Sequence, residues 1–202
     1  RFDDGSSDNL TRTTDTPDNR DKFTVSAWIK LSSHASKNPI VAFYGSNDYC
    51  SLMYNDERIQ FIVYDGGSIA NITLTSRHRD FSAWYHIVFA FDTTQATASD
   101  RVKIYINGIQ VTAFDTASYP SQNYQEGWGF TNNTTAYISA QNWEGSVNST
   151  NSLYWSNFYF IDGQQLGPEY FGYTDPLTNT WRPKKFIKQA SPNDGTTWSS
   201  YL

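Results

Sequence analysis

The sequence predicts an all-β protein built as a two-sheet antiparallel sandwich, and three observations support this fold class. Apolar and polar residues alternate over many short segments, polar turns separate these segments, and no segment has the period of an amphipathic helix of three turns. Aromatic residues make up 17% of the 202 residues, and such flat side chains pack well on a pleated sheet.

The longest alternating segment is 23–31, whose odd-numbered residues from Phe23 to Leu31 share one apolar face while the even-numbered residues share the other. The pair Asn107–Gly108 predicts a tight hairpin, since both central residues of a type I′ turn need positive φ. Further strands are expected at 39–44, 49–54, 59–63, 70–74, 85–91, 102–106, 109–111, 135–140 and 153–161.

One sandwich domain is expected over residues 1–180, because no repeat or low-complexity linker interrupts them. Residues 181–202 are expected to form an irregular basic extension that ends in a short strand at 198–202. The chain begins with Arg1 rather than Met, so we expect a fragment or a processed product.

The net charge of −5 argues against nucleic acid as a partner, because phosphate binding needs a basic surface. The charge is uneven along the chain. Two explanations stay open: two solvated segments that lie near each other, or a basic strip that docks on an acidic neighbour in an assembly. The acidic group is Asp3, Asp4, Asp8, Asp15, Asp18 and Asp21, and the basic group is Arg182, Lys184, Lys185 and Lys188.

Cys50 is the only cysteine, so no disulfide forms within the chain, and we expect it to be a small buried hydrophobe. No segment approaches the roughly 18 apolar residues of a membrane span, so no membrane insertion is expected, and there is no signal-peptide core. An aromatic-rich β protein without disulfides fits folding in a reducing cytosol and use outside it, as for virion proteins.

Four segments carry a resemblance to known proteins: FTVSAWIK (23–30), RDFSAWYHIVFAFDTTQATASDRVKIYINGIQV (79–111), SYPSQNY (118–124) and FYFIDGQQL–FGYTD–WRPKKF within 158–186. In this order the chain resembles the concanavalin A-like superfamily of LamG and pentraxin-type jelly rolls. More narrowly, it resembles the LamG-like modules of marine bacteriophage structural proteins. The chain departs from this pattern at Leu153, where many relatives carry a glycine.

The sequence argues against catalysis. Members of this superfamily that hydrolyse glycans use alternating carboxylates on one strand, about 5 Å apart. None of Glu57, Glu126, Glu144 and Glu169 belongs to such a pattern, and the adjacent Asp56 and Glu57 would point to opposite faces of a strand. We therefore expect no enzyme activity.

No histidine is expected to be catalytic or to bind zinc. His86 lies in a core-type strand, and no serine, cysteine or carboxylate partner stands at a recognisable spacing from it. We expect His86 to be structural. His34 and His78 are isolated loop-type residues, and no spacing of histidine and cysteine indicates a zinc site.

No cofactor is required, although the resemblance implies that calcium can bind at one edge of a sheet. The candidate ligands share loop-edge positions, and turn chemistry alone also explains acidic residues there. These candidates are Asp48, Asp65, Asp92 and Asp115, together with Asn132.

Glycan binding needs flat aromatic faces and planar amides, and two loop regions supply both. The alternative is that these aromatic side chains pack the loops onto the sandwich or onto a neighbouring subunit. The candidates are Tyr124, Trp128, Asn132, Asn133, Asn142 and Trp143.

Together these features predict a non-catalytic surface module of a bacteriophage virion, such as a tail or head fibre, a spike or a capsid decoration. It would fold in the host cytoplasm, assemble with other virion subunits as a homo-oligomer, and adhere to host polysaccharide. A secreted carbohydrate-binding lectin is the alternative, and a glycoside hydrolase comes third.

Overall fold

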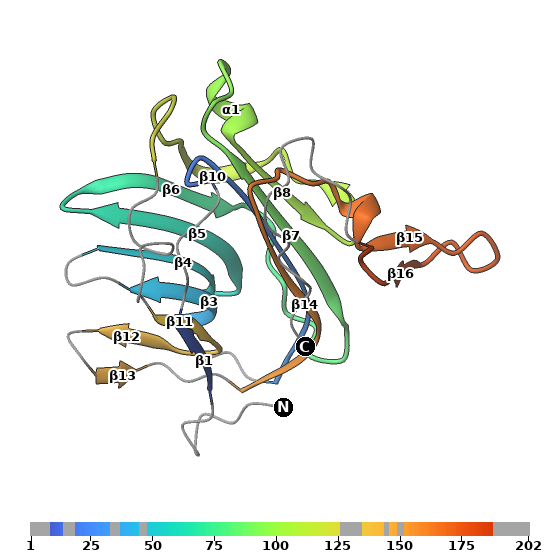
Figure 1. Cartoon of the computed structure of the whole chain (residues 1–202). Helices are drawn as coiled ribbons and strands as arrows, with labels where there is room; N and C mark the ends of the chain where they lie inside the picture. The colour runs from blue at the N-terminus through green and yellow to red at the C-terminus, as the bar shows by residue number, and fades with distance from the viewer. Residues whose placement is uncertain are drawn as a thin grey trace.

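The computed structural model describes residues 9–13, 19–32, 37–44, 48–125, 135–143, 146–148 and 152–187 of the chain. Two large antiparallel sheets face each other (Figure 1). The helical segments among the described residues are the one-turn helix α1 (Ala98–Arg101) and a 3-10 turn, η1 (Pro168–Tyr170). None of the described helices is long and apolar enough to cross a membrane.

One sheet has seven strands and the other has five. The seven-stranded sheet has the order β1 (Leu10–Thr13), β11 (Thr135–Ile138), β3 (Asn38–Tyr44), β4 (Asp48–Asn55), β5 (Arg58–Asp65), β6 (Ser68–Leu74) and β10 (Phe114–Ser118). The five-stranded sheet has the order β14 (Leu153–Asp162), β2 (Lys22–Leu31), β7 (Tyr85–Asp92), β8 (Val102–Ile106) and β9 (Ile109–Gln110). The prediction of a two-sheet antiparallel sandwich is confirmed.

Two separate hairpins complete the structure: β12 (Gln141–Trp143) with β13 (Ser146–Asn148), and β15 (Gly172–Thr174) with β16 (Trp181–Pro183). The strand predicted at 135–140 ends at Ile138, where Ser139 takes a positive φ of 66°. The predicted Asn107–Gly108 turn is confirmed, with φ of 50° and 83°.

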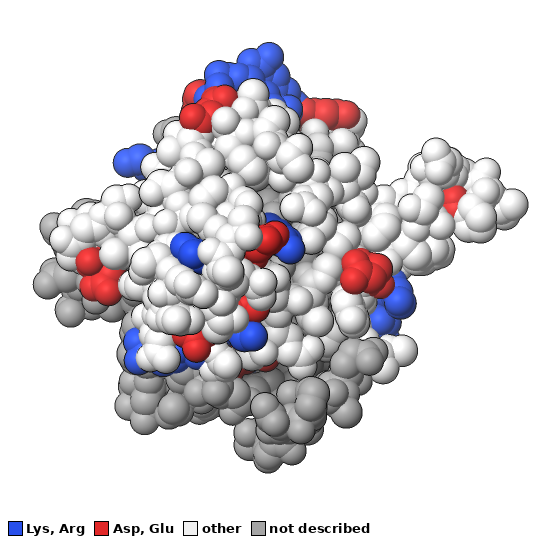
Figure 2. Space-filling view, turned by 90° about the horizontal axis from the view of Figure 1, so that it is seen from above, with Lys and Arg blue, Asp and Glu red and all other residues white. Residues whose placement is uncertain are grey.

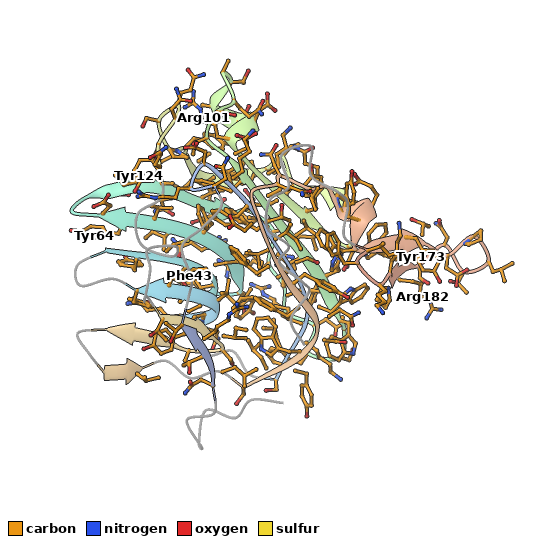
Figure 3. All side chains as sticks on the ribbon, viewed as in Figure 1. Phe43, Tyr64, Arg101, Tyr124, Tyr173 and Arg182 are labelled. Atoms are coloured by element: carbon orange, nitrogen blue, oxygen red, sulfur yellow. The ribbon has the colours of Figure 1, made fainter. Side chains whose placement is uncertain are left out.

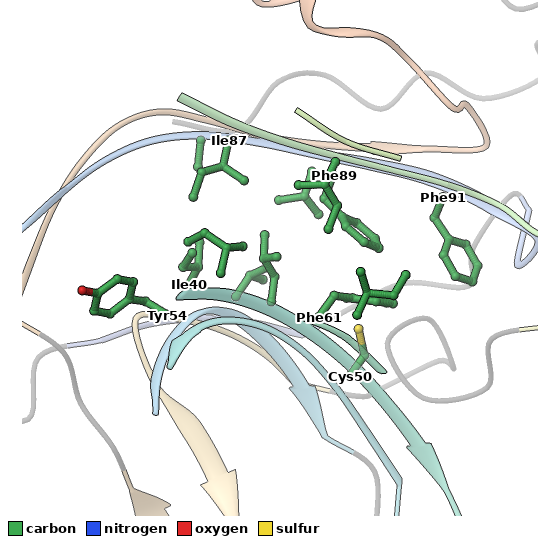
Figure 4. Close-up of a cluster of buried hydrophobic side chains, with 14 of the residues drawn as sticks. Ile40, Cys50, Tyr54, Phe61, Ile87, Phe89 and Phe91 are labelled. Atoms are coloured by element: carbon green, nitrogen blue, oxygen red, sulfur yellow. The ribbon is translucent and has the colours of Figure 1, made fainter. Parts of the chain in front are cut away.

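The main core lies between the two sheets (Figure 4). Its centre is aromatic: the ring centroids of Phe61 and Phe89 are 4.0 Å apart, and those of Phe23 and Phe91 are 4.7 Å apart. Cys50 is buried among these residues, as expected for a small hydrophobe. Burial of each large side chain contributes about 1.5–3 kcal/mol to folding, so this layer holds the two sheets together.

A second, smaller core lies on the outer face of the five-stranded sheet, where the segment after β14 folds back over it. Because this segment covers the sheet, both faces of β2 are buried. On the second face, the Thr24 hydroxyl makes two hydrogen bonds. The hydroxyl donates to the Gln164 carbonyl at 2.6 Å and accepts from the Leu166 N–H at 2.8 Å. The second core consists of Val88, Tyr159, Ile161, Leu166, Phe171 and Phe186.

The C-terminal part of the chain takes part in this second core. Phe186 stacks on Phe171 with ring centroids 5.3 Å apart, and β16 pairs with β15. The expected boundary between residues 180 and 181 therefore falls inside the β15–β16 hairpin. The short strand expected at 198–202 lies outside the described residues.

Leu153, which stands where many relatives have glycine, is buried in the main core and pairs with Leu31. The irregularity of β14 comes later, between Ser156 and Tyr159, where Asn157 has a positive φ of 50°. A leucine is therefore accommodated at 153, because the backbone bends at a different position.

Candidate functional site

His86 is the centre of a buried cluster that joins three parts of the fold. It lies in β7 with no exposed surface, and its backbone exchanges two hydrogen bonds of 2.8 Å with Asn107 of the hairpin turn. The indole Nε1–H of Trp181 donates to His86 Nδ1 at 2.9 Å, and His86 Nε2 lies 2.9 Å from Ser26 Oγ. The Trp28 ring stacks on the imidazole at 5.0 Å.

This geometry sets the protonation of His86. Because Nδ1 accepts from Trp181, the neutral ring carries its proton on Nε2 and donates it to Ser26 Oγ. Burial lowers the pKa of His86 to about 4, so the ring is neutral at pH 7. Both ring nitrogens are occupied and no carboxylate orients the imidazole, so the Ser26–His86 pair lacks the arrangement of an activated nucleophile. This geometry agrees with the structural role expected from the sequence.

His78 lies in a loop, as expected, but it is buried there, and burial lowers its pKa. Its backbone N–H donates to the Glu57 carbonyl at 2.7 Å and its carbonyl accepts from the Tyr54 hydroxyl at 2.7 Å. The alternation pattern could not show this, because the residue lies outside a strand. His34 lies outside the described residues.

The outer face of the seven-stranded sheet carries a row of stacked tyrosines. Alternation turns Cys50 and Val63 into the core and therefore turns Tyr49 and Tyr64 outward. Tyr44 stacks on Tyr49 at 5.7 Å, and Tyr49 stacks on Tyr64 at 5.5 Å. We call Tyr44, Tyr49 and Tyr64 the tyrosine row. Burial raises the pKa of Tyr44 and Tyr49, so both hydroxyls stay protonated and can donate hydrogen bonds.

A chain of amides lies on the same face, further along the strands. Asn55 Nδ2 donates to Gln60 Oε1 at 3.0 Å, and Gln60 Nε2 donates to Asn71 Oδ1 at 3.1 Å. We call Asn55, Gln60 and Asn71 the amide row. All three side chains are half-buried, and the bonds between them fix the orientation of each amide plane.

The two rows lie on the same face, where the half-buried Ile62 lies between them on β5, whereas Ser51 and Met53 lie between them on β4 and are buried. Tyr64 and Gln60 both face outward from β5 and are four residues apart, which is roughly 13 Å along a strand. The strands of this sheet arch with their convex side toward the core, so the outer face is concave (Figure 4). A concave strip with aromatic faces at one end and oriented amides at the other suits an extended polar ligand.

Of the six loop residues predicted to bind glycan, the structure describes the side chain of Tyr124. It is half-buried and packs against the main core, and its hydroxyl donates to Asp65 Oδ2 at 3.3 Å at the end of β5 (Figure 3). Thr135, ten residues after Gln125, pairs with Tyr44. The residue after the loop 126–134 is therefore paired with Tyr44 of the tyrosine row, and the Tyr124 side chain before the loop lies at the end of β5. Trp128, Asn132 and Asn133 belong to that loop and lie outside the described residues.

Asn142 and Trp143 are placed by their backbone alone. They lie on β12, paired with Val147 and Ser146 of β13, and their side chains lie outside the described residues. Strand β12 packs beside β3, the strand that carries Tyr44. The backbone of this predicted region is therefore near the same sheet.

The four calcium candidates are spread over both sheets. Asp48 and Asp65 are direct backbone partners in the β4–β5 register, and by alternation Asp65 falls on the face opposite to Tyr64. Asp115 pairs with Arg58 at 3.0 Å. Among the residues that the structure describes, no group of three or more His, Cys, Asp or Glu could hold a metal ion.

Asp92, the fourth candidate, already has a full set of partners. It accepts hydrogen bonds from Thr94 N at 3.0 Å and Gln95 Nε2 at 2.8 Å, and it pairs with Lys22 Nζ at 3.3 Å. Burial alone would raise the pKa of Asp92, but the hydrogen bonds from Thr94 and Gln95 lower it below the ordinary value. A cation here would have to displace Lys22.

Neither of the described glutamates, Glu57 and Glu169, lies on a strand that carries the tyrosine or amide row. Glu57 lies in the β4–β5 turn, where hydrogen bonds from Arg79 and Arg77 lower its pKa, so it cannot serve as a proton donor near neutral pH. Glu169 lies in η1, beside the other sheet. Next to the amide row, Arg58 of β5 pairs with the carboxylates of Asp56 at 3.3 Å and Asp115 at 3.0 Å. Glu126 and Glu144 lie outside the described residues.

Comparison with known families agrees with this geometry. Residues 4–150 match the family described as "Concanavalin A-like lectin/glucanases superfamily". The chain belongs to this superfamily. The predicted jelly-roll sandwich and its superfamily are thereby confirmed, and no match was found among curated proteins.

The chain is similar to several solved structures at low sequence identity, and the first of them, with a TM-score above 0.5, has the same fold. A botulinum neurotoxin DC binding domain, solved in complex with SialylT, is 15% identical with a TM-score of 0.52 over 80% of this chain and 37% of that chain. A heptameric SAP-like pentraxin from Limulus polyphemus is 17% identical with a TM-score of 0.49, over 75% and 68%. The present chain therefore corresponds to well under half of the neurotoxin chain.

A third structure is domain 4 of a GH43 extracellular arabinanase from Geobacillus stearothermophilus, in complex with arabinotriose. It is 16% identical with a TM-score of 0.44, over 73% of this chain and 64% of that chain.

The tyrosine and amide rows were not predicted from the sequence, although a signal for them was present. The same alternation that places Cys50 and Val63 in the core places Tyr49 and Tyr64 on the opposite face. Short turns then set the register that aligns them across the sheet. The sequence instead indicated the loop aromatic residues as exposed, because they lie outside alternating segments. The three tyrosines of the row lie at strand ends, inside alternating segments.

Proposed function

We propose that this chain is a non-catalytic glycan-binding module whose ligand lies along the concave outer face of the seven-stranded sheet. The observation that carries the proposal is the joint presence, on that one face, of the stacked Tyr44, Tyr49 and Tyr64 and the bonded amides of Gln60 and Asn71. Aromatic faces bury the CH groups of a sugar, while oriented amides and tyrosine hydroxyls exchange hydrogen bonds with its hydroxyls.

The superfamily supports this proposal, since its description names lectins and glucanases, and the botulinum neurotoxin DC binding domain was solved in complex with SialylT. The backbone beside two of the predicted loop segments supports the proposal: Thr135, which follows the loop that contains Trp128, pairs with Tyr44, and β12, which contains Trp143, packs beside β3. The described carboxylates support binding rather than hydrolysis, because Glu57 is held ionised by two arginines.

We further propose the setting expected from the sequence: a surface module of a bacteriophage virion, assembled with other virion subunits and adhering to host polysaccharide. The resemblance of residues 158–186 to phage-type modules and the single buried cysteine support it. A secreted lectin is the alternative, and binding to glycans from non-bacterial sources alone would favour it.

A glycan array followed by titration calorimetry tests the proposal. Tyr64→Ala and Gln60→Ala should each weaken glycan binding by about tenfold, which corresponds to about 1.4 kcal/mol, without loss of fold. The matched control is Trp84→Ala, which removes an exposed aromatic side chain just before β7 of the other sheet and should leave binding unchanged.

Two results would contradict the proposal. If Trp128→Ala and Trp143→Ala abolish binding while Tyr64→Ala and Gln60→Ala have no effect, the loops alone hold the ligand. If the protein releases reducing ends from laminarin, agar or host capsule, it is a hydrolase.

Calcium binding remains a prediction, with Asp48 and Asp65 as the pair that the register brings together. Melting curves with excess EDTA and with added calcium chloride test it. A calcium-dependent rise in melting temperature that disappears in Asp65→Asn would assign the ion to this edge.

A further inference from the structure

The β15–β16 hairpin stands out from the sandwich as a separate arm. It projects away from the five-stranded sheet in Figure 1, and the view from above in Figure 2 shows the same projection, largely without charged side chains. We call residues 172–183 the arm. Two of the most exposed apolar side chains of the described chain lie on it: Leu177 is 93% exposed and Tyr173 is 48% exposed.

The base of the arm is rigid. The Trp181 ring lies so close to Gly108 that an added Cβ there would come within 2.6 Å of it, and Gly172 is packed against the same ring. The indole also donates to His86 in the buried cluster. The arm therefore cannot swing freely about its base.

The tip of the arm is equally well defined. The Asp175 side chain accepts from the Leu177 N–H at 2.9 Å, and the Asp175 backbone bonds to Thr180 and to Asn179 at 2.8 Å each. Arg182 Nε lies 3.5 Å from Asp175 Oδ2. The loop thus holds Leu177 outward in a fixed conformation, which reduces the entropy cost of burying it in an interface.

Further apolar and basic side chains surround the arm. Ile109 (74% exposed) follows the glycine that packs on Trp181, and Ile187 (70% exposed) lies at the end of the described chain. Exposed Arg182, Lys184 and Lys185 make this region basic, with Asp175 as the one carboxylate of residues 172–187. Exposed apolar side chains with a charged rim are typical of a protein contact.

We infer that the arm docks on a second copy of this chain. Charge complementarity identifies the partner: the whole chain has a net charge of −5 while the arm region is basic, so the rest of each copy is acidic. The sequence also places six aspartates between residues 3 and 21. An arm that contacts a different surface of the next copy makes a head-to-tail interface, which closes into a ring or extends as a filament.

This contact is compatible with the proposed glycan site and does not depend on it. The arm extends from the five-stranded sheet, whereas the tyrosine and amide rows lie on the outer face of the other sheet (Figure 1). Head-to-tail association leaves those faces free, so several weak glycan contacts combine into strong attachment.

Sedimentation velocity of the whole protein over a range of concentrations tests the inference. We expect self-association that weakens at least tenfold in Leu177→Asp, and that weakens with added salt and in an Arg182→Glu/Lys185→Glu variant. Val147→Asp introduces a carboxylate at an exposed valine (45%) outside the arm and should leave association intact. Melting curves confirm that each variant is folded.

A cross-linking experiment locates the contact. A photoreactive amino acid at position 177, in a mixture of unlabelled and ¹⁵N-labelled protein, should give cross-links between the two isotopic forms. A monomer at every concentration would overturn the inference. Association unaffected by Leu177→Asp, or cross-links confined to single chains, would equally overturn it. Glycan binding by Leu177→Asp stays measurable in each case and reports separately on the proposed function.

Discussion

The indole of Trp181 donates a hydrogen bond of 2.9 Å to Nδ1 of His86, although the two residues are 95 positions apart in the sequence. This one bond joins the arm to the centre of the five-stranded sheet, and it fixes the imidazole as the neutral form with its proton on Nε2. His86 is therefore part of the scaffold, and its partner in the arm is Trp181.

Trp181→Phe should destabilise the protein by about 1–3 kcal/mol, because His86 Nδ1 would remain buried without a donor. Urea denaturation measures this change. Trp84→Phe is the control, since Trp84 is 40% exposed and its substitution should change the free energy of unfolding by less than about 0.5 kcal/mol. Equal effects of the two substitutions would contradict the role given to the Trp181–His86 bond.

His86 should make stability depend on pH. Its pKa is about 4 in the folded protein and about 6.5 when unfolded, so between these values the unfolded chain binds more protons. The contribution of His86 to the free energy of unfolding is therefore fully present above about pH 6.5 and is lost progressively toward pH 4. This contribution is about 3 kcal/mol. His78, whose pKa is also lowered, acts in the same direction.

The comparison of wild type with His86→Gln isolates the contribution of His86. The variant should be less stable at pH 7 but should show a shallower fall in unfolding free energy between pH 6.5 and pH 4.5. Identical slopes for the two proteins would show that His86 does not titrate on unfolding.

Gly172→Ala should loosen the arm, because the new methyl group would overlap the Trp181 ring. We expect destabilisation of about 1–3 kcal/mol and a change in tryptophan fluorescence. Gly67→Ala is the matched control, since nothing lies within 4 Å of its added Cβ and its φ is ordinary. A melting temperature of Gly172→Ala equal to that of Gly67→Ala would contradict the packing described.

Truncation tests which residues the sandwich needs. A chain ending at 187 should fold, whereas a chain ending at 180 should be strongly destabilised because it lacks Trp181 and Phe186. Loss of a buried phenylalanine alone costs about 3–5 kcal/mol. Far-UV circular dichroism and thermal melting compare the two. A stable chain of residues 1–180 would place the domain boundary where the sequence composition suggested.

The sequence indicated the strands well because alternation is a local property. The predicted strands from 23–31 to 153–161 are all present, and the positive φ values of Asn107 and Gly108 are those that an Asn-Gly turn requires. What alternation could not reveal is that Thr24 and Ser26, on the second face of β2, are buried as well, because their cover comes from residues 164–186.

The sequence by itself therefore determined the fold class, the superfamily and the structural nature of His86, since these depend on periodicity and on motifs a few residues long. Tertiary structure decided which residues share a surface. The stacking of Tyr44, Tyr49 and Tyr64 depends on the register of three strands, and the rigid arm depends on the contact of Trp181 with a histidine 95 residues away. Such pairings are set by long-range packing, which no local pattern of residues contains.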